Sequence, residues 1–257
     1  MGALLIRLTH GAADLAVGAA VEAAGHPAVG RDAGSVAGIG EIGVPVTSDP
    51  DALAGADVAV DFSLHTAVPA NVRAAAKHGK PVVIGTTGLT ADEDAAVRDA
   101  ARTVPVLRAP NMSRGMNLLF ALIEQAARVL GREYDAEIVE THHRHKKDAP
   151  SGTALRLAES ISRGRGQDPA QSLCYGRRGE TGERPAGQIG VHALRAGDEV
   201  GEHTVLFATE GERVAFSHRA GSREAFAAGA LHAARWLVTR RPGLYDMQDV
   251  LGLKNAT

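Results

Sequence analysis

Residues 140–154, ETHHRHKKDAPSGTA, hold a dense group of ionisable side chains. Three histidines, one arginine and two lysines occupy six consecutive positions at the end of a β-forming run, and Ser151, Gly152 and Thr153 then open a predicted helix. The N–H groups at a helix N-terminus favour a bound carboxylate or phosphate, and basic side chains reinforce that preference. A histidine nearby exchanges a proton close to neutral pH. The segment therefore predicts an anion-binding site with a proton donor beside it.

Two other interpretations of this segment are open. In one it is a solvated basic loop, and in the other His142, His143, His145 and Asp148 bind a metal ion. We expect no metal, because Arg144 and the two lysines that follow would repel a cation.

The elements that must position this segment fall into two groups. Up to about residue 132, short apolar runs alternate with alanine-rich stretches, which predicts a parallel, doubly wound sheet. The predicted strands are 3–8, 56–62, 80–85 and 104–109, and the predicted helices are 14–24, 66–77 and 91–101. A capping box, Thr90 to Glu93, opens the last of these helices.

Beyond a long predicted helix over 115–130, the pattern changes. Strand-like runs at 135–145, 187–196, 202–209 and 212–220 follow without a regular alternation of helices, which predicts an open mixed sheet. A closing helix over 223–240 is expected to pack back on the first domain. The fold class is therefore α/β, with a Rossmann-like parallel-sheet domain and an α+β domain.

Composition limits the classes of partner. Hydrophobic residues make up 44% of the chain and charged residues 23%, and the formal net charge is −2, so neither a nucleic acid nor a membrane is an expected partner. Cys174 is the one cysteine, so the chain forms no internal disulfide and a cytoplasmic location is expected.

The basic segment is similar to the signature of the dihydrodipicolinate reductase family of the lysine/diaminopimelate pathway. The likeness continues through GVPVTSD, VDFS, HGKPVVIGTTGL, APNMSRGMNLL, YGRRGETGER and GLYDMQDVLGL, over about residues 25–253. The resemblance implies a Rossmann-like domain over 1–112 and 223–257, and a domain over 113–222 that binds substrate and assembles a homotetramer.

The resemblance also implies roles for individual residues. It makes His142 the proton donor and Lys146 the catalytic lysine, and it points two loops at the nicotinamide and the substrate ring. The predicted substrate-binding residues are His143, Arg144, Ser151, Gly152, Thr153 and Thr87. The predicted cofactor-facing residues are Gly85, Thr86, Gly88, Ala109, Pro110, Asn111 and Met112.

The first 34 residues depart from the family pattern. With residues 3–8 taken as the first strand, the three glycines of the pyrophosphate turn fall on His10, Ala13 and Ala16, and its basic residue falls on Asp14, which would repel a pyrophosphate. Asp32 has about the spacing of the ribose-binding acid but follows no apolar run, so the second strand is expected to be missing.

These departures favour a non-redox enzyme, a lyase or isomerase in which His142 and Lys146 act on a cyclic or imine-forming dicarboxylate without a cofactor. Two alternatives are open: an NADPH- or NADH-dependent reductase with a weakened cofactor site, and a non-catalytic dicarboxylate-binding subunit. The expected partners are this small-molecule dicarboxylate and further copies of the chain.

Overall fold

The computed structural model describes residues 1–254 and divides into two compact units. Unit 1 contains Met1–Arg114 and the chain from Glu224 onward, and unit 2 contains Gly115–Arg223. Within the described residues, no helix combines the length and apolarity that a bilayer crossing requires.

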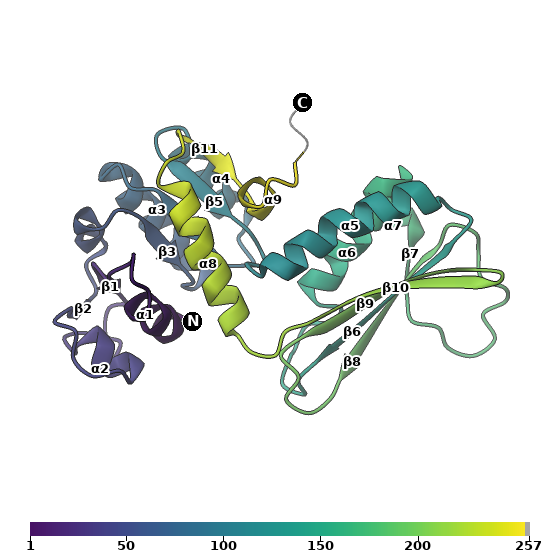
Figure 1. Cartoon of the computed structure of the whole chain (residues 1–257), viewed down its shortest axis with the longest axis horizontal. Coiled ribbons are helices and arrows are strands. Elements are labelled where there is room, and N and C mark those ends of the chain that lie inside the picture. The colour runs from purple at the N-terminus through teal and green to yellow at the C-terminus, as the bar shows by residue number, and fades with distance from the viewer. Residues whose placement is uncertain (255–257) are drawn as a thin grey trace. The chain divides into compact units, whose positions relative to one another are not determined.

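Unit 1 is built on a four-stranded parallel sheet in the order β11-β5-β4-β3 (Figure 1). Successive side chains of these strands point to opposite faces, so each face has its own core. Val83 and Leu107 share one cluster with helices α1 and α8, whereas Val82, Ile84 and Val106 share another with α3 and α4. The strands are β3 (Ala59–Asp61), β4 (Val82–Ile84), β5 (Pro105–Arg108) and β11 (Gly243–Tyr245). The helices are α1 (Gly2–His10), α3 (Val68–Lys77), α4 (Ala91–Ala100), α8 (Glu224–Leu237) and α9 (Met247–Val250), with 3-10 turns at Pro50–Gly55 and His65–Ala67.

The predicted Rossmann-like class is confirmed, and so are most of its elements. Three predicted strands and the helices after them appear as β3, α3, β4, α4 and β5. The capping box forms with both of its hydrogen bonds, because Thr90 accepts from the backbone of Glu93 and Glu93 accepts from the backbone of Thr90.

The first predicted strand is wrong: residues 3–8 lie in helix α1. Leu4, Leu5 and Leu8 lie on one face of this helix and pack in the α8 cluster, whereas Ile6 faces a small separate core. An apolar run of six residues suits a strand or a buried helix equally well, and here packing decided for the helix. The helix predicted over 14–24 is also wrong, because this stretch has no helix and contains a short strand at Ala20–Val21.

A second, two-stranded sheet completes the amino-terminal part. Strand β1 (Ala20–Val21) pairs in parallel with β2 (Val46–Thr47), and the short helix α2 (Ala33–Ala37) lies between them in sequence. Asp32 caps α2, and its carboxylate accepts the backbone N–H groups of Gly34, Ser35, Ile42, Gly43 and Val44. Asp32 therefore holds this loop together.

The order of the strands shows which strand would join the two sheets of unit 1 into one. In the dinucleotide-binding order 3-2-1-4-5-6, β2 and β1 take places 3 and 2, and β3, β4 and β5 take places 4, 5 and 6. Across residues 1–254 no strand takes place 1. The unfilled place is therefore that of the first strand, and not of the second, as the sequence had suggested.

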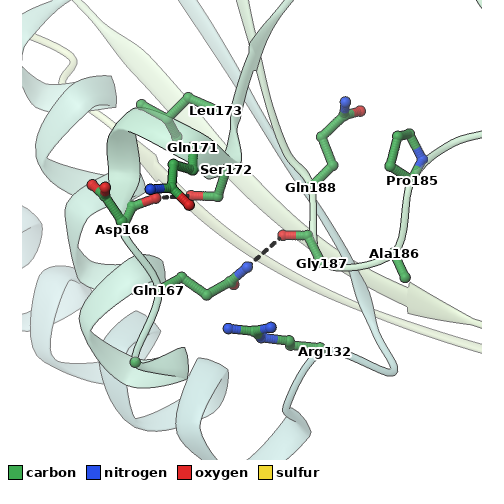
Figure 2. Close-up of a pocket in the computed structure, with 11 residues that line it drawn as sticks. Arg132, Gln167, Asp168, Gln171, Ser172, Leu173, Pro185, Ala186, Gly187 and Gln188 are labelled. Carbon is green, nitrogen blue, oxygen red and sulfur yellow. Dashed lines mark hydrogen bonds between the residues drawn. The ribbon is translucent and has the colours of Figure 1, made fainter.

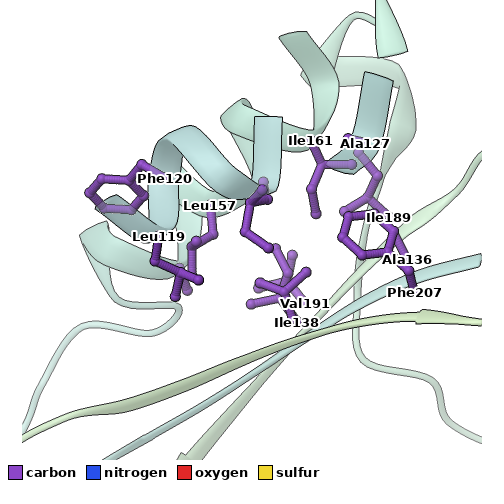
Figure 3. Packing of buried hydrophobic residues seen from close by; sticks show 14 of the residues in the cluster. Leu119, Phe120, Ala127, Ala136, Ile138, Leu157, Ile161, Ile189, Val191 and Phe207 are labelled. Carbon is purple, nitrogen blue, oxygen red and sulfur yellow. The ribbon is translucent and has the colours of Figure 1, made fainter. Parts of the chain in front are cut away.

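Unit 2 is a five-stranded mixed sheet in the order β10-β9-β6-β8-β7. The predicted mixed sheet is confirmed, and its edge strand over 173–175 was not predicted. Helices α5 (Arg114–Leu130) and α6 (Gly152–Arg165) cover one face, where Leu157 and Ile161 meet Ile138 and Phe207 (Figure 3). The strands are β6 (Asp135–His142), β7 (Leu173–Tyr175), β8 (Ile189–Arg195), β9 (Glu202–Thr209) and β10 (Glu212–Arg219), and a short helix α7 (Pro169–Ser172) precedes β7.

Candidate functional site

His142 lies at the end of β6, and a buried carboxylate holds its ring. Glu140 is fully buried, and its Oε2 lies 2.5 Å from His142 Nδ1. Residues two apart on a strand point to the same face, so β6 itself brings these side chains together. Because an ionised carboxylate can only accept, Nδ1 carries the hydrogen and Nε2 is left with its lone pair.

Glu140 remains ionised because three groups donate to it. Arg195 forms a bidentate pair with both carboxylate oxygens at 2.9 Å, and the backbone N–H of Ser151 donates to Oε1 at 3.0 Å. Burial alone raises the pKa of Glu140, but the hydrogen bonds from Arg195, His142 and Ser151 outweigh it and hold that pKa below its usual range. Burial also lowers the pKa of His142, and the Glu140 carboxylate opposes that shift only in part.

His203 of β9 closes the other side of the His142 ring. The two rings meet edge to face with centroids 5.1 Å apart, and His203 Nε2 lies 3.1 Å from Ser151 Oγ. His203 is only 4% exposed, and burial, with a smaller contribution from His142, lowers its pKa to about 3. His203 is therefore a neutral packing group at physiological pH.

This buried histidine predicts a loss of stability in mild acid. In the unfolded chain His203 protonates near pH 6.5, whereas in the folded chain it stays neutral down to about pH 3. Between these values the unfolded state binds more protons, so the free energy of unfolding falls as the pH falls, by up to about 1.4 kcal/mol per pH unit. Urea unfolding at pH 7, 6 and 5 should show a shallower decline for His203→Gln than for the unsubstituted protein. Equal slopes would contradict the assignment.

The loop after β6 is anchored by its backbone. The N–H groups of His143 and Arg144 donate to the carbonyls of Glu199 and Gly197, which fixes the loop against the β8–β9 connection. Arg144 is exposed, and Lys146 is partly buried with Nζ 2.9 Å from Asp148 Oδ1. This Lys146 contact lowers the pKa of Asp148. A substrate carboxylate would therefore compete with Asp148 for the Lys146 ammonium.

The Ser-Gly-Thr turn at the start of α6 has one buried residue and two that solvent can reach. Ser151 is buried and caps the helix, with its Oγ accepting from the backbone of Ala154. Gly152 is exposed, and a Cβ built on it meets nothing within 4 Å. Thr153 is half-buried. A ligand can reach the first turn at Gly152, whereas Ser151 supports the turn from beneath.

In unit 1 the remaining predicted residues lie at one edge of the sheet. Residues 85–88 follow β4 and residues 109–112 follow β5, and the carboxyl ends of adjacent parallel strands share an edge. Thr87, Gly88 and Pro110 are exposed and Asn111 is half-buried, whereas Thr86, Ala109 and Met112 are buried. Gly85 lies under the Phe62 ring, where a Cβ would come within 2.3 Å of Cε1. The exposed members are the ones that can touch a ligand.

Two further features lie apart from these residues. In the described chain no group of three or more histidine, cysteine, aspartate or glutamate side chains is arranged to hold a metal ion. A pocket of about 470 Å³ in unit 2 lies between the α6–α7 connection and residues 185–188, and Arg132 and Gln167 reach toward it (Figure 2). None of the predicted site residues lines this pocket.

The structure overturns the expectation of a degraded pyrophosphate turn. The turn precedes the first helix of a dinucleotide-binding unit, whereas His10 ends α1, Gly11 is its C-cap, and Ala13 and Ala16 come later still. The three positions matched to the glycines therefore lie at or beyond the carboxyl end of α1, whereas the pyrophosphate turn belongs before its amino end. Asp14 is exposed and pairs with Arg235 through two hydrogen bonds of 2.6 and 2.7 Å, which lower its pKa, so it holds no place that a pyrophosphate needs.

Glu22 has the position expected of a ribose-binding acid. Glu22 directly follows β1, and it comes about 20 residues after the amino end of α1, which is the spacing and strand position expected of that acid. Its Oε1 accepts the N–H of Ala23 at 2.8 Å, and the side chain is exposed. The strand is only two residues long within an alanine-rich stretch, which is why the sequence pattern did not reveal it.

Comparison with known proteins gives a consistent result for both units. Family models described as the N-terminus and the C-terminus of dihydrodipicolinate reductase match residues 1–112 and 115–251. A 4-hydroxy-tetrahydrodipicolinate reductase of Anaeromyxobacter dehalogenans is 56% identical over 255 residues, covering 99% of this chain and 94% of the relative. The reductase of Halorhodospira halophila is 51% identical over 254 residues, covering 98% of this chain and 95% of the relative.

Among solved structures, a dipicolinate-bound dihydrodipicolinate reductase from Paenisporosarcina sp. TG-14 has the same fold. The TM-score is 0.71 at 22% sequence identity, over 96% of this chain and 93% of that one. This likeness supports the fold assignment alone.

These relatives are reductases, so the prediction of a non-redox lyase or isomerase is wrong. The same finding leaves the expectation of no cofactor and of a lost cofactor site without support. The predicted family is confirmed. The wrong prediction of a non-redox enzyme came from the first 34 residues, where helix α1 was predicted as a strand and strand β1 as part of a helix.

Proposed function

The chain belongs to the dihydrodipicolinate reductase family, and from that premise we propose that it is an NAD(P)H-dependent 4-hydroxy-tetrahydrodipicolinate reductase. The observation that carries the proposal is the identity of 56% with such a reductase over 99% of the chain. Unit 1 would bind the cofactor, and unit 2 would bind the substrate and assemble the oligomer.

The substrate is a cyclic compound with two carboxylates, and unit 2 offers cations and a helix N-terminus for them. His143, Arg144 and Lys146 lie on the loop after β6, and Gly152 and Thr153 lie at the start of α6. A carboxylate in the first turn of α6 would be stabilised by the helix dipole and by these cationic side chains. The Lys146 ammonium would leave the Asp148 carboxylate and pair with a carboxylate of the substrate.

Unit 1 offers groups for a dinucleotide after strands of both of its sheets and at the start of α1. Glu22 would accept hydrogen bonds from the ribose hydroxyls, and the first N–H groups of α1, which lack intrahelical partners, are suited to the pyrophosphate. The exposed residues Thr87, Gly88 and Pro110 would flank the nicotinamide. When bound, a reduced nicotinamide supplies the hydride for the reduction.

Within unit 2, His142 is placed to move a proton at Nε2, because Nδ1 is committed to Glu140. The neutral ring takes a proton from solvent and passes it to the substrate, and Lys146 keeps the neighbouring carboxylate neutralised. Dipicolinate, which has the same pair of carboxylates as the substrate, is a suitable unreactive probe of this site.

The test of the function is NADPH- and NADH-dependent reduction of 4-hydroxy-tetrahydrodipicolinate by the purified protein, followed at the nicotinamide absorbance. Calorimetric titration with each nucleotide accompanies it. We expect turnover together with micromolar binding of at least one nucleotide. Turnover of the substrate without nucleotide oxidation, or no nucleotide binding up to millimolar concentration, would contradict the proposal.

Glu22→Gln is expected to weaken nucleotide binding by about tenfold or more, because a charge-assisted hydrogen bond to the ribose is lost. Calorimetry with NADH and NADPH measures the change. Asp14→Asn is the control: Asp14 pairs with Arg235, so its replacement should leave both affinities as they are. The reverse pattern would restore Asp14 as a cofactor-facing residue and exclude Glu22.

We also propose a homotetramer and a cytoplasmic location. On the face of the unit 2 sheet opposite Ile138 and Phe207, Val139 and Leu194 are exposed, and apolar side chains there suit association with further copies of the chain. The single thiol of Cys174 is free, as is usual for a protein of a reducing compartment.

A further inference from the structure

The surroundings of His142 leave its ring one orientation. Glu140 is fully buried, its carboxylate receives four hydrogen bonds, and three of them come from groups that do not titrate near neutral pH: two from Arg195 and one from the backbone of Ser151. The fourth comes from His142 Nδ1. A carboxylate held in this way cannot turn away from the histidine without leaving the Arg195 guanidinium unpaired.

The groups around His142 come from four elements, and Glu140 supplies the negative charge among them. The charged groups near the ring are Glu140 on β6, Arg195 on β8 and Lys146 on the loop, while His203 on β9 is neutral and itself fixed by Ser151. His218 on β10 lies behind His203. Glu140 is the one anion among these groups, so the hydrogen on Nδ1 depends on it.

The opposite nitrogen of the ring faces a glycine. A Cβ built on Gly201, in the connection between β8 and β9, would lie 3.0 Å from His142 Nε2 and 3.7 Å from His203 Cε1. That distance is shorter than ordinary van der Waals contact, so any larger residue would occupy the space that a proton acceptor or a water needs beside Nε2.

We infer that Glu140 is a positioning residue that holds His142 in the Nδ1–H tautomer, and that Gly201 keeps the space beside Nε2 open for proton transfer. The inference rests on the proposed function, in which His142 moves a proton. It extends the site by two residues, Glu140 and Gly201, that were not among the predicted site residues.

The first test is Glu140→Gln, followed by nitrogen NMR of the protein labelled in its histidines, without substrate or nucleotide. In the unsubstituted protein His142 should show a protonated Nδ1 and a bare Nε2. In Glu140→Gln we expect a mixture of tautomers and a lower pKa for His142, because an amide can accept or donate and no longer favours the imidazolium. We expect kcat to fall by about 10²-fold with KM nearly unchanged, within the range that a positioned proton-transfer group contributes.

The matched control is Glu137→Gln, the same change on the same strand. Glu137 binds Arg177, Arg184 and His192 and lies on the other face of β6. This control also breaks a network of ion pairs, so it should cost stability, yet the His142 resonances should not move. If both variants shift these resonances equally, Glu140 acts only through general stability and the inference fails.

Gly201→Ala tests the second half. The His142 tautomer and pKa should match the unsubstituted protein, while kcat falls by roughly tenfold or more because the methyl group crowds Nε2. Gly201 has a φ of +159°, which strains an alanine there, so urea unfolding of the same variant separates lost stability from lost kcat. Full activity in Gly201→Ala would overturn the role of Gly201.

A second variant and a readout that does not depend on activity keep the inference testable. If Glu140→Gln does not fold, Glu140→Asp retains the charge opposite Arg195 but is one methylene shorter, so the hydrogen bond to Nδ1 should lengthen and the His142 pKa should fall. An unchanged pKa there would count against the inference. If the protein does not reduce the substrate, the proposed function fails, whereas the NMR spectra still decide whether Glu140 holds the tautomer.

Discussion

Replacing His142 with glutamine is expected to lower kcat for substrate reduction by roughly 10²- to 10⁴-fold, the contribution of a positioned proton-transfer group. Glutamine preserves a polar side chain but cannot exchange a proton. The nucleotide would bind in unit 1, whereas His142 lies in unit 2, so the Kd of the nucleotide should stay within about twofold. Steady-state kinetics together with calorimetry on the same preparation measures both quantities.

Lys146→Met serves as the companion variant for His142→Gln. It removes a cation expected to face a substrate carboxylate, so KM should rise more than kcat falls. Equal kcat for His142→Gln and the unsubstituted protein would mean that the proton comes from elsewhere. A loss of nucleotide affinity in His142→Gln would mean that this substitution disturbs more than the His142 side chain.

Replacing Phe207 with alanine is expected to destabilise unit 2 by about 3–5 kcal/mol, the usual cost of truncating a buried aromatic residue. Phe207 is fully buried in the core under α5 and α6 (Figure 3). Its ring meets the Phe216 ring edge to face, with centroids 6.3 Å apart. The cavity left by the ring cannot be filled by the helices without loss of their contacts with β6 and β9. Amide hydrogen exchange, resolved by peptide, measures the effect within Gly115–Arg223.

Val129→Ala is the control for Phe207→Ala. Val129 lies on α5 but is 77% exposed, so its truncation should change stability by no more than about 0.5 kcal/mol. The accelerated exchange in Phe207→Ala should appear in β6, β8 and β9 together, because one core joins them. Acceleration confined to β9 and β10 would mean that the core is not cooperative.

The fold was predictable where the sequence pattern was strong. The strands ending at Asp61, Ile84 and Arg108 combine apolar β-branched residues with clear boundaries, and Thr90 and Glu93 mark a helix start by their chemistry. The amino-terminal part failed because its signals are weak. A two-residue strand has no period to detect, and the apolar run before it suits either kind of element.

The candidate site was predictable in its exposed half only. The basic segment is contiguous in sequence, so His142, His143 and Lys146 could be found together. Glu140 could also have been found, because a strand that presents His142 presents the residue two positions earlier on the same side. Arg195 and His203 could not, since their approach depends on the register of β6 with β8 and β9.

The division of the unit 1 strands into two separate sheets affects how that unit opens. The part formed by α1, α2, β1 and β2 is attached to the larger sheet through side-chain packing, such as Leu5 in the α8 cluster, and through the Asp14–Arg235 ion pair. No ladder of backbone hydrogen bonds joins the two sheets among residues 1–254. Such a part can unfold as a unit of its own at a free energy below that of the whole domain. A nucleotide that touched both Glu22 and the loops after β4 and β5 would fasten the two parts, so the order of the amino-terminal fifty residues would follow cofactor concentration.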